Sequence, residues 1–364
     1  MRRLFTILSF SFACLTVNAQ TTHLIQSKAL AEDRLVNIQL PQGYDKADES
    51  YGVLYVLDGE YAYDYAVGAV SFLSNAFGHM PALIVVGIPN IDRLRDVHVM
   101  HNKQDSYSKF LEFVESELKP FIDSNYRTNG FDIIYGWSSA SDISMQFLVT
   151  KPGLFDAHIQ SGTGVGPKTA AFLSKELSKH NYENRYLYAG TEGAGPRAAG
   201  LVKYKSLVDS LNPKNLRWKF ELMHSSSHVD VLGEGIYSGL KFVFNDFYIP
   251  DSVVLKGVEA IKGYYATLNE AYDFPVKIPV GAFGESAGIL FQSKPEEAVK
   301  LLKYGLTIYP ASADLHGALG EVYEYLDQKE MAAQYYNLAF ERSIPESAMA
   351  MKYRYLSNKF EVGK

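Results

Sequence analysis

The feature that most constrains the fold is an alternation of short β-rich runs with amphipathic helical stretches, which extends from about residue 34 to residue 246. Strands that alternate with helices form a mainly parallel sheet with helices on both faces. In the stretch 105–118 apolar residues recur at helical spacing, and Pro120 predicts the end of that helix. The predicted strands are residues 34–40, 52–57, 82–88, 131–135, 157–160, 185–189 and 218–222. The sequence therefore predicts an α/β fold with a doubly wound, mainly parallel sheet.

After residue 250 the strand signals cease, and the chain reads as helices broken by prolines up to Lys364. Two units of this tail repeat with a period of about 34 to 36 residues. Gly284, Ala298, Leu302, Gly305 and Pro310 in one unit correspond to Gly320, Ala332, Tyr336, Ala339 and Pro345 in the next. The repeat resembles tetratricopeptide repeats, with a generic helical bundle as the alternative. We therefore predict an α/β domain at 20–250 and an all-α helical-repeat domain at 251–364, whose surface is a candidate for binding a protein partner.

The amino-terminal segment predicts export. Two arginines precede an apolar run from Leu4 to Val17, and the small residue Ala19 ends a cleavage pattern before Gln20. A bilayer span needs about twenty apolar residues, so this run favours a signal peptide at 1–19 over a membrane anchor. A lipoprotein attached through Cys14 is a weaker alternative. The mature protein is expected to be periplasmic or extracellular, with no membrane span.

Composition excludes several classes of function. Cys14 is the only cysteine, so cleavage after Ala19 leaves no thiol for nucleophilic, disulfide or metal chemistry. Removing the two arginines of the leader changes the formal charge from −6 to −8, and an acidic balance argues against nucleic acid as a partner. The nine histidines lack metal-ligand spacing, and no phosphate-binding glycine pattern with its acidic partner is found. We expect neither a metal nor a cofactor.

A candidate nucleophile lies where the predicted strand 131–135 ends. The sequence continues as Gly136-Trp137-Ser138-Ser139-Ala140-Ser141 and then as an apolar-periodic helix. A serine on such a strand-turn-helix bend exposes its hydroxyl above the sheet, and small residues two places to either side permit the bend. The amide of Ser139, at the start of the helix, is a candidate oxyanion donor. The alternative is that Ser138 only caps this helix.

Several segments resemble the enterochelin-esterase and esterase D family, in consistent order from about residue 25 to residue 248. They are VLYVLDGE at 53–60, VGIPNIDRLRD at 86–96, KPFIDSNYRT at 119–128, KPGLF at 151–155 and IYSGLK at 236–241. The resemblance implies an α/β-hydrolase that cleaves esters with a serine, a histidine and an acid. The family's nucleophile motif reads G-H-S-L-G-G. This chain keeps Ser138 but changes its neighbours, including Trp137, which we assign to substrate binding.

The resemblance also suggests the partners of Ser138. The family's histidine precedes a Leu-Tyr pair by about nine residues, and counting back from Tyr237 gives His228, with His224 as the competitor. In this fold the acid lies between serine and histidine in the chain and orients the imidazole. Glu192, in a glycine-flanked loop after the strand 185–189, fits this requirement, although a solvated loop glutamate is the alternative.

Two further loops are expected at the site. A second oxyanion donor should come from the amide of Glu60 or Tyr61, where Gly59 gives the backbone freedom to turn. Arg93 and Arg95 lie in a stretch similar to the family's D-R-x-R-D motif, and we assign them to shaping the pocket and binding substrate. A solvated ion-pair loop is the alternative interpretation of that stretch.

The sequence therefore predicts an exported serine hydrolase in which Ser138 attacks the carbonyl carbon of an ester and His228 takes its proton. Siderophore, acyl and feruloyl-type esters are all compatible with the resemblance. The altered neighbours of Ser138 motivate a contrary hypothesis: a hydrolase domain that no longer catalyses and serves as a scaffold, while the helical tail binds a protein partner.

Overall fold

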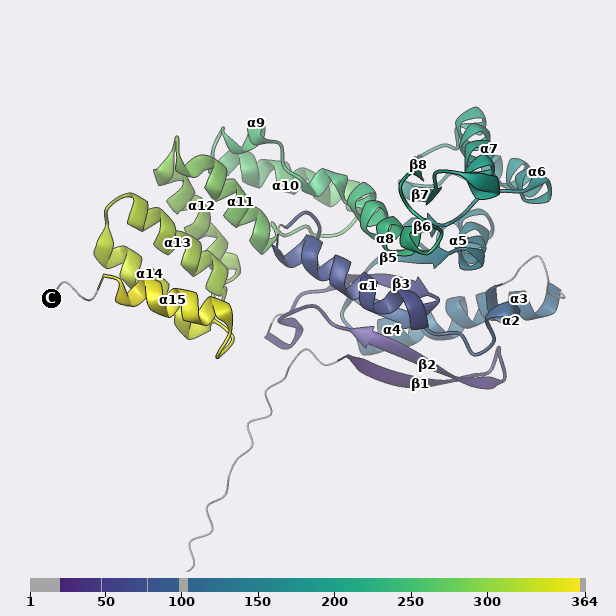
Figure 1. The fold of residues 1–364 in the computed structure, drawn as a ribbon, viewed down its shortest axis with the longest axis horizontal. Coiled ribbons are helices and arrows are strands. Elements are labelled where there is room, and N and C mark those ends of the chain that lie inside the picture. Colours follow the sequence, from purple (N-terminus) through teal and green to yellow (C-terminus); the bar gives the residue numbers. More distant parts are fainter. Residues whose placement is uncertain (1–19, 47, 77, 98–103, 361–364) are drawn as a thin grey trace, which may run out of the picture.

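The computed structural model describes residues 20–360 except 47, 77 and 98–103, and its α/β part is built on an eight-stranded sheet (Figure 1). The strand order is β1-β2-β4-β3-β5-β6-β7-β8. β3 to β8 run parallel to one another, while β1 and β2 are antiparallel to their neighbours. The strands are β1 Thr21–Ser27, β2 Glu32–Gln39, β3 Tyr51–Leu57, β4 Leu83–Ile88, β5 Thr128–Trp137, β6 Ala157–Ser161, β7 Arg185–Glu192 and β8 Leu216–Met223. The doubly wound α/β fold and all of its predicted strands are confirmed.

Only the edge strand β1 was not predicted from the sequence. Its side chains are mostly exposed, with Ile25 and Ser27 as the buried exceptions, so it has no alternating apolar pattern. β3, in the middle of the sheet, is buried at every position. A strand covered on both faces reads as a continuous apolar run, which is why β3 was easy to predict.

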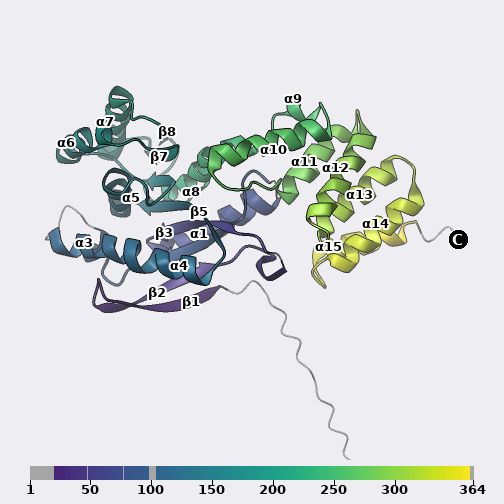
Figure 2. The same ribbon diagram turned by 180° about the vertical axis from the view of Figure 1, so that it is seen from behind.

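Helices cover both faces of the sheet (Figures 1 and 2). On one face α1 and α8 pack against side chains of β3 such as Leu54 and Val56. On the other face α3, α4 and α5 enclose a cluster that includes Val53 and Tyr55 of β3, and α5, α6 and α7 enclose a further cluster. The helices of this part are α1 Gly59–Ser71, α2 Arg93–Val97, α3 Gln104–Phe113, α4 Lys119–Asn125, α5 Ser139–Thr150, α6 Pro167–Glu176, α7 Gly195–Leu211 and α8 Asp230–Val243.

The prediction that a helix stops before Pro120 is wrong. A π-helical turn, Val114–Leu118, follows α3 and leads directly into α4, which continues to Asn125. Pro120 lies in the first turn of α4. A proline lacks an N–H donor, and the shift in hydrogen-bond register at a π-helical turn accommodates such a residue without ending the helix.

The part of the tail that the structure describes is entirely helical after residue 250. Its helices are α9 Asp251–Val254, α10 Val258–Tyr272, α11 Val280–Phe291, α12 Pro295–Ile308, α13 Ala313–Tyr325, α14 Lys329–Arg342 and α15 Ala348–Asn358. The two predicted units correspond to the pairs α11 with α12 and α13 with α14. Gly320 is needed for close packing, because a Cβ there would lie 2.6 Å from the Tyr336 ring, whereas Gly284 faces open space. The tetratricopeptide character of these pairs stays a prediction.

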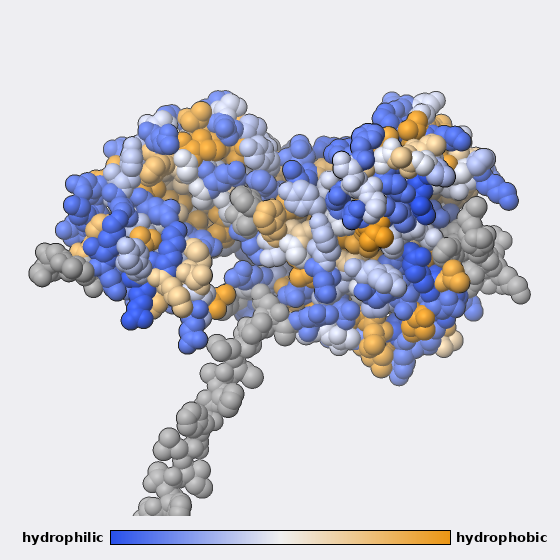
Figure 3. Space-filling view, in the orientation of Figure 1, coloured by the Kyte–Doolittle hydropathy of each residue, from blue (hydrophilic) through white to orange (hydrophobic). Residues whose placement is uncertain are grey.

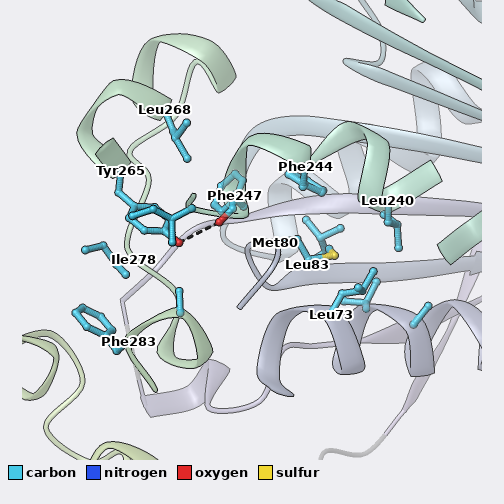
Figure 4. Close-up of a cluster of buried hydrophobic side chains, with 14 of the residues drawn as sticks. Leu73, Met80, Leu83, Leu240, Phe244, Phe247, Tyr265, Leu268, Ile278 and Phe283 are labelled. Atoms are coloured by element: carbon cyan, nitrogen blue, oxygen red, sulfur yellow. Dashed lines mark hydrogen bonds between the residues drawn. The ribbon is translucent and has the colours of Figure 1, made fainter. Parts of the chain in front are cut away.

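The tail and the sheet share one hydrophobic core (Figure 4). Phe244 and Phe247, at the end of the α/β part, pack in the same cluster as Tyr265 and Phe283 from the tail. The Tyr265 hydroxyl donates to the carbonyl of Phe247 at 3.0 Å. The two parts are therefore joined by buried apolar contacts, and the domain boundary at residue 250 stays a prediction.

The tail packs at the amino-terminal ends of the parallel strands. α1 starts just after β3, and the loop that follows α1 contacts the tail, since a Cβ on Gly78 would lie 2.3 Å from the backbone nitrogen of Ala282. α8 ends at Val243, whose carbonyl accepts a hydrogen bond from Tyr272. A helix of 13 residues such as α1 spans roughly 20 Å, so the tail lies far from the carboxyl ends of the strands.

The visible surface is largely hydrophilic, with separate hydrophobic patches over both the α/β part and the tail (Figure 3). Within the described ranges, no helix has the length and apolar character needed to cross a membrane. The predicted signal peptide at 1–19, with Cys14, lies outside the described residues.

Candidate active site

Ser138 occupies a strained bend between β5 and α5. Its φ of 56° and ψ of −123° are rarely adopted by a residue with a side chain, and such strain is concentrated at functional sites. Gly136 makes the bend feasible, because a Cβ there would lie 2.3 Å from the carbonyl oxygen of Ala140. The Ser138 amide donates to the carbonyl of Ser161 at 2.8 Å. The Ser138 side chain makes no capping bond to α5, so the structure does not favour the helix-cap interpretation.

Three of the predicted residues meet above the carboxyl ends of β5 and β7. The His228 Nε2 lies 3.1 Å from the Ser138 Oγ, and the His228 Nδ1 lies 3.3 Å from the Glu192 Oε2. With the proton on Nδ1, the imidazole donates to the carboxylate and accepts from the serine hydroxyl. This is the arrangement in which a histidine acts as a general base and a carboxylate orients it.

The loop that carries His228 is ordered by reciprocal hydrogen bonds between Ser227 and the first residue of α8, Asp230. Ser227 donates its amide and its hydroxyl to the Asp230 carboxylate, and the Asp230 amide donates back to the Ser227 hydroxyl. His228 lies between these two residues. The competing residue, His224, lies against Gly193 instead and lines a different pocket with Tyr65 and Glu221.

Glu192 has partners that the sequence analysis missed. Thr191 donates its hydroxyl to the Glu192 Oε2 at 2.6 Å, and Arg197 forms an ion pair with the Oε1 at 3.3 Å. Burial alone would raise the pKa of Glu192, but hydrogen bonds from Thr191, from its own amide and from His228 outweigh that effect and lower the pKa. The carboxylate is therefore charged throughout the neutral pH range. The solvated-loop alternative does not describe this glutamate.

Replacing Glu192 with glutamine is expected to lower kcat by about 10²- to 10⁴-fold. A glutamine amide can donate to Nδ1 and so stabilise the tautomer whose Nε2 cannot accept the serine proton. Steady-state hydrolysis of a p-nitrophenyl ester measures this. Arg197→Gln, which removes the ion pair but keeps the carboxylate, should lower kcat by less than about tenfold. If Glu192→Gln kept the full kcat, Glu192 would not be the orienting acid.

The turn after β3 separates the two candidates for the second oxyanion donor. The Tyr61 amide donates to the carbonyl of Asp58 at 2.9 Å in the first turn of α1. Glu60 is the second residue of α1, a position whose amide has no intrahelical acceptor, so Glu60 is the better candidate. Ser139 is the first residue of α5, and its amide points toward the amino-terminal end of that helix.

Gly59 was expected to give the backbone freedom to turn, and this physical reason is wrong. The residue with positive φ in this turn is Asp58, at 53°. Gly59 is required because the turn passes close to β4: a Cβ there would lie 2.6 Å from the backbone nitrogen of Ile88. The Asp58 carboxylate is fully buried and accepts from Arg93 and Asn90, and Asn90 also bonds Glu60.

The two arginines of the D-R-x-R-D stretch have different surroundings. Arg93 bonds both oxygens of Asp58, at 2.9 and 2.7 Å, and its guanidinium lies 5.8 Å from the centre of the Trp137 ring. Arg95 pairs with Glu32 and Asp96, and Asp96 in turn bonds the buried Arg34. Arg95 is thus part of an ion-pair network between α2 and β2. These ion pairs favour the ion-pair interpretation of Arg95, and its assignment to substrate binding stays a prediction.

Gly162 is a site residue that the sequence analysis did not single out. It has a φ of +60°, and a Cβ there would lie 2.7 Å from the His228 Cε1. The substitution Gly162→Ala is therefore expected to displace the imidazole and to lower kcat at least tenfold, because a displacement of about 1 Å can lower the rate by about 10²-fold. Gly130→Ala is a matched control, since Gly130 also has a positive φ, of +87°, but a Cβ there meets nothing within 4 Å. Unchanged kcat in Gly162→Ala would contradict the proposed position of His228.

The described part of the chain contains no group of three or more histidine, cysteine, aspartate or glutamate residues that could hold a metal ion.

A serine on a strained bend, paired with a histidine and an acid above a doubly wound sheet, defines the class as α/β-hydrolase. Residues 27–188 match the family model described as "Putative esterase". No curated protein matches the chain.

Solved structures share the fold. An IroE-like serine hydrolase from Shewanella oneidensis has a TM-score of 0.65 and 22% identity, over 89% of this chain and all of that one. An uncharacterised protein from Capnocytophaga ochracea has a TM-score of 0.62 and 19% identity, over 94% of this chain and all of that one. The siderophore hydrolase EstB from Aspergillus nidulans has a TM-score of 0.53 and 15% identity, over 65% of this chain and 98% of that one. The first two structures cover more of this chain than residues 1–250, so the matched region includes helices of the tail.

Proposed function

We propose that the protein is a serine hydrolase that cleaves carboxylic esters through an acyl-enzyme on Ser138. The observation that carries the proposal is the 3.1 Å contact between the Ser138 Oγ and the His228 Nε2, with Glu192 on the opposite nitrogen of the same ring. The altered residues after Ser138 do not disrupt this geometry. Ala140 and Ser141 are both buried, and the Ser141 hydroxyl donates to the Ser138 carbonyl at 2.6 Å.

In the first half of the reaction His228 accepts the hydroxyl proton while the Ser138 Oγ attacks the carbonyl carbon. The amides of Ser139 and Glu60 would stabilise the negative oxygen of the tetrahedral intermediate. Collapse of the intermediate releases the alcohol, which takes the proton from His228. In the second half His228 accepts a proton from water as the water attacks the acyl-enzyme, and returns it to Ser138 as the acid leaves.

The surface around the site favours an uncharged, apolar acyl group. Exposed apolar side chains lie on the segments that carry site residues: Tyr61 beside Glu60, Ile91 and Leu94 on either side of Arg93, and Val229 beside His228. The guanidinium groups of Arg93 and Arg95 are already paired with carboxylates. Among these residues, hydrophobic contact is therefore a better source of affinity than ion pairing with an anionic substrate.

A fluorophosphonate probe tests the proposed chemistry, because it phosphonylates only an activated serine. We expect stoichiometric labelling of the full chain, with the adduct located on Ser138 by mass spectrometry and lost in Ser138→Ala. Ser139→Ala is a matched control that keeps the backbone amide, so it should label at the rate of the unsubstituted protein. Absence of labelling in the unsubstituted protein would support the alternative, in which the hydrolase part is an inactive scaffold.

Substrate preference is tested with pairs of p-nitrophenyl esters whose acyl chains match in length but end in either a methyl or a carboxylate group. We expect kcat/KM to be higher for the uncharged member of each pair. Catecholate and feruloyl esters belong in the same panel, because both siderophore and feruloyl-type substrates remain compatible with the site. A preference for the anionic members would contradict the apolar acyl subsite.

We also propose that the protein is exported and that it begins at Gln20 after cleavage. The support is the sequence of residues 1–19 alone. Expression of the full chain followed by intact-mass measurement of the periplasmic and secreted fractions tests this. A protein that kept residues 1–19 and remained inside the cell would contradict the proposal.

A further inference from the structure

Trp137 contacts the histidine of the site in two ways. Its indole Nε1 donates a hydrogen bond to the backbone carbonyl of His228 at 2.9 Å. Its ring also stacks on the His228 imidazole, with centroids 5.0 Å apart and an interplanar angle of 30°. The first contact fixes the backbone of the loop, and the second fixes the plane of the side chain that must align with the Ser138 Oγ.

The Trp137 indole is itself held by a further residue, Arg93. The Arg93 guanidinium lies 5.8 Å from its ring centre, and the Arg93 Nη2 approaches the Trp137 carbonyl at 3.5 Å. Arg93 is in turn fixed by its two bonds to the fully buried Asp58. A chain of contacts therefore runs from the turn after β3, through Arg93 and Trp137, to His228.

The backbone leaves the imidazole little other space. A Cβ on Gly162 would lie 2.7 Å from the His228 Cε1 and 3.1 Å from the Trp137 Nε1, so Gly162 closes the site beside both rings. An imidazole between an indole face and a backbone segment has few rotamers available. Restricting a general base in this way reduces the entropy that must be lost when it aligns with the nucleophile.

We propose that Trp137 is a positioning residue that holds His228 in line with Ser138, rather than a residue that binds substrate. The proposal rests on the esterase function proposed above. It gives a physical role to the first departure from the family motif, where this chain has tryptophan directly before the nucleophile in place of histidine. Arg93 contributes to this positioning, because its guanidinium also contacts the indole, 5.8 Å from the ring centre.

Two substitutions of Trp137 distinguish the effect of the hydrogen bond from the effect of the ring stacking. Trp137→Phe keeps an aromatic face for stacking but loses the N–H donor, and Trp137→Leu loses both. We expect kcat to fall about tenfold in Trp137→Phe and about 100-fold in Trp137→Leu, with KM within about twofold of the unsubstituted value in both. The rate of fluorophosphonate labelling should fall in parallel with kcat, because it reports the activation of Ser138 without a bound ester.

Trp218 provides the control, since it is the other tryptophan of the chain and its indole donates to Asp209 of α7, outside the site. Trp218→Phe should leave kcat and the labelling rate unchanged, and thermal unfolding shows whether each variant is folded. A raised KM with unchanged kcat and labelling rate in Trp137→Leu would overturn the proposal in favour of substrate binding. Unchanged values in both Trp137 variants would overturn it as well. Failure of the esterase proposal can be distinguished from failure of the positioning proposal, because in the first case the unsubstituted protein would not be labelled.

Discussion

Replacing His228 with alanine is expected to lower kcat by about 10⁴- to 10⁶-fold, the loss seen when a triad member is removed. The Ser138 hydroxyl has no other histidine within hydrogen-bonding distance among the described residues, so no second base can take its proton. The double variant Ser138→Ala with His228→Ala should have a kcat no lower than that of the less active single variant, because the two groups act as a unit. Steady-state kinetics with a p-nitrophenyl ester measures all three.

The control for this prediction is His224→Ala. His224 lies in the same loop, four residues earlier, but it lines the pocket beside Tyr65 and Glu221 and packs on Gly193. Its substitution should leave kcat within about twofold. If His224→Ala abolished turnover and His228→Ala did not, the positions of the two histidines in solution would have to differ from those in the structure.

Much of the site could be placed from the sequence because its geometry depends on short local patterns. The bend at Ser138 needs a strand before it, a helix after it and a small residue at Gly136, and all three are visible in about a dozen residues. His228 was found by its spacing from Tyr237 in a family resemblance. Glu192 followed from the rule that ligands meet at the carboxyl ends of parallel strands.

The parts that could not be predicted depend on contacts between distant segments. Whether Arg95 faces a substrate or Glu32 is decided by the pairing of β2 with β4, which brings residue 32 next to residue 95. The need for Gly162 appears only when its distance from His228 is known. The continuation of the helix through Pro120 depends on a change in hydrogen-bond register that no local sequence rule marks.

Tertiary packing shows whether the tail could cover the mouth of the active-site pocket. A cover over the pocket mouth would require the tail to reach the carboxyl ends of the strands. Instead it contacts the opposite ends of α1 and α8, at Gly78 and Val243. The described part of the tail therefore packs at the end of the strands away from Ser138.

Deleting residues 251–364 is expected to prevent the α/β part from folding into a soluble, cooperatively unfolding protein. Phe131, Phe244 and Phe247 are nearly fully buried, and their aromatic partners include Tyr272 and Phe274 from the tail. Full burial of one phenylalanine contributes about 1.5 to 3 kcal/mol. The free energy lost by exposing several such side chains is comparable with the total free energy of unfolding of a domain, about 5 to 15 kcal/mol. Solubility and thermal unfolding of chain 20–250 against 20–364 measure the effect.

A point substitution separates stability from catalysis in the same experiment. Phe274→Ala in the full chain should lower the free energy of unfolding by about 3 to 5 kcal/mol, since it removes a buried ring packed on Phe131. Its kcat at a temperature where it is folded should match that of the unsubstituted protein, because Ser138 lies at the other end of the sheet. Tyr355→Ala, at a side chain 71% exposed on α15, should change neither quantity. A soluble 20–250 fragment with the stability and kcat of the full chain would show instead that the tail is not needed for the fold.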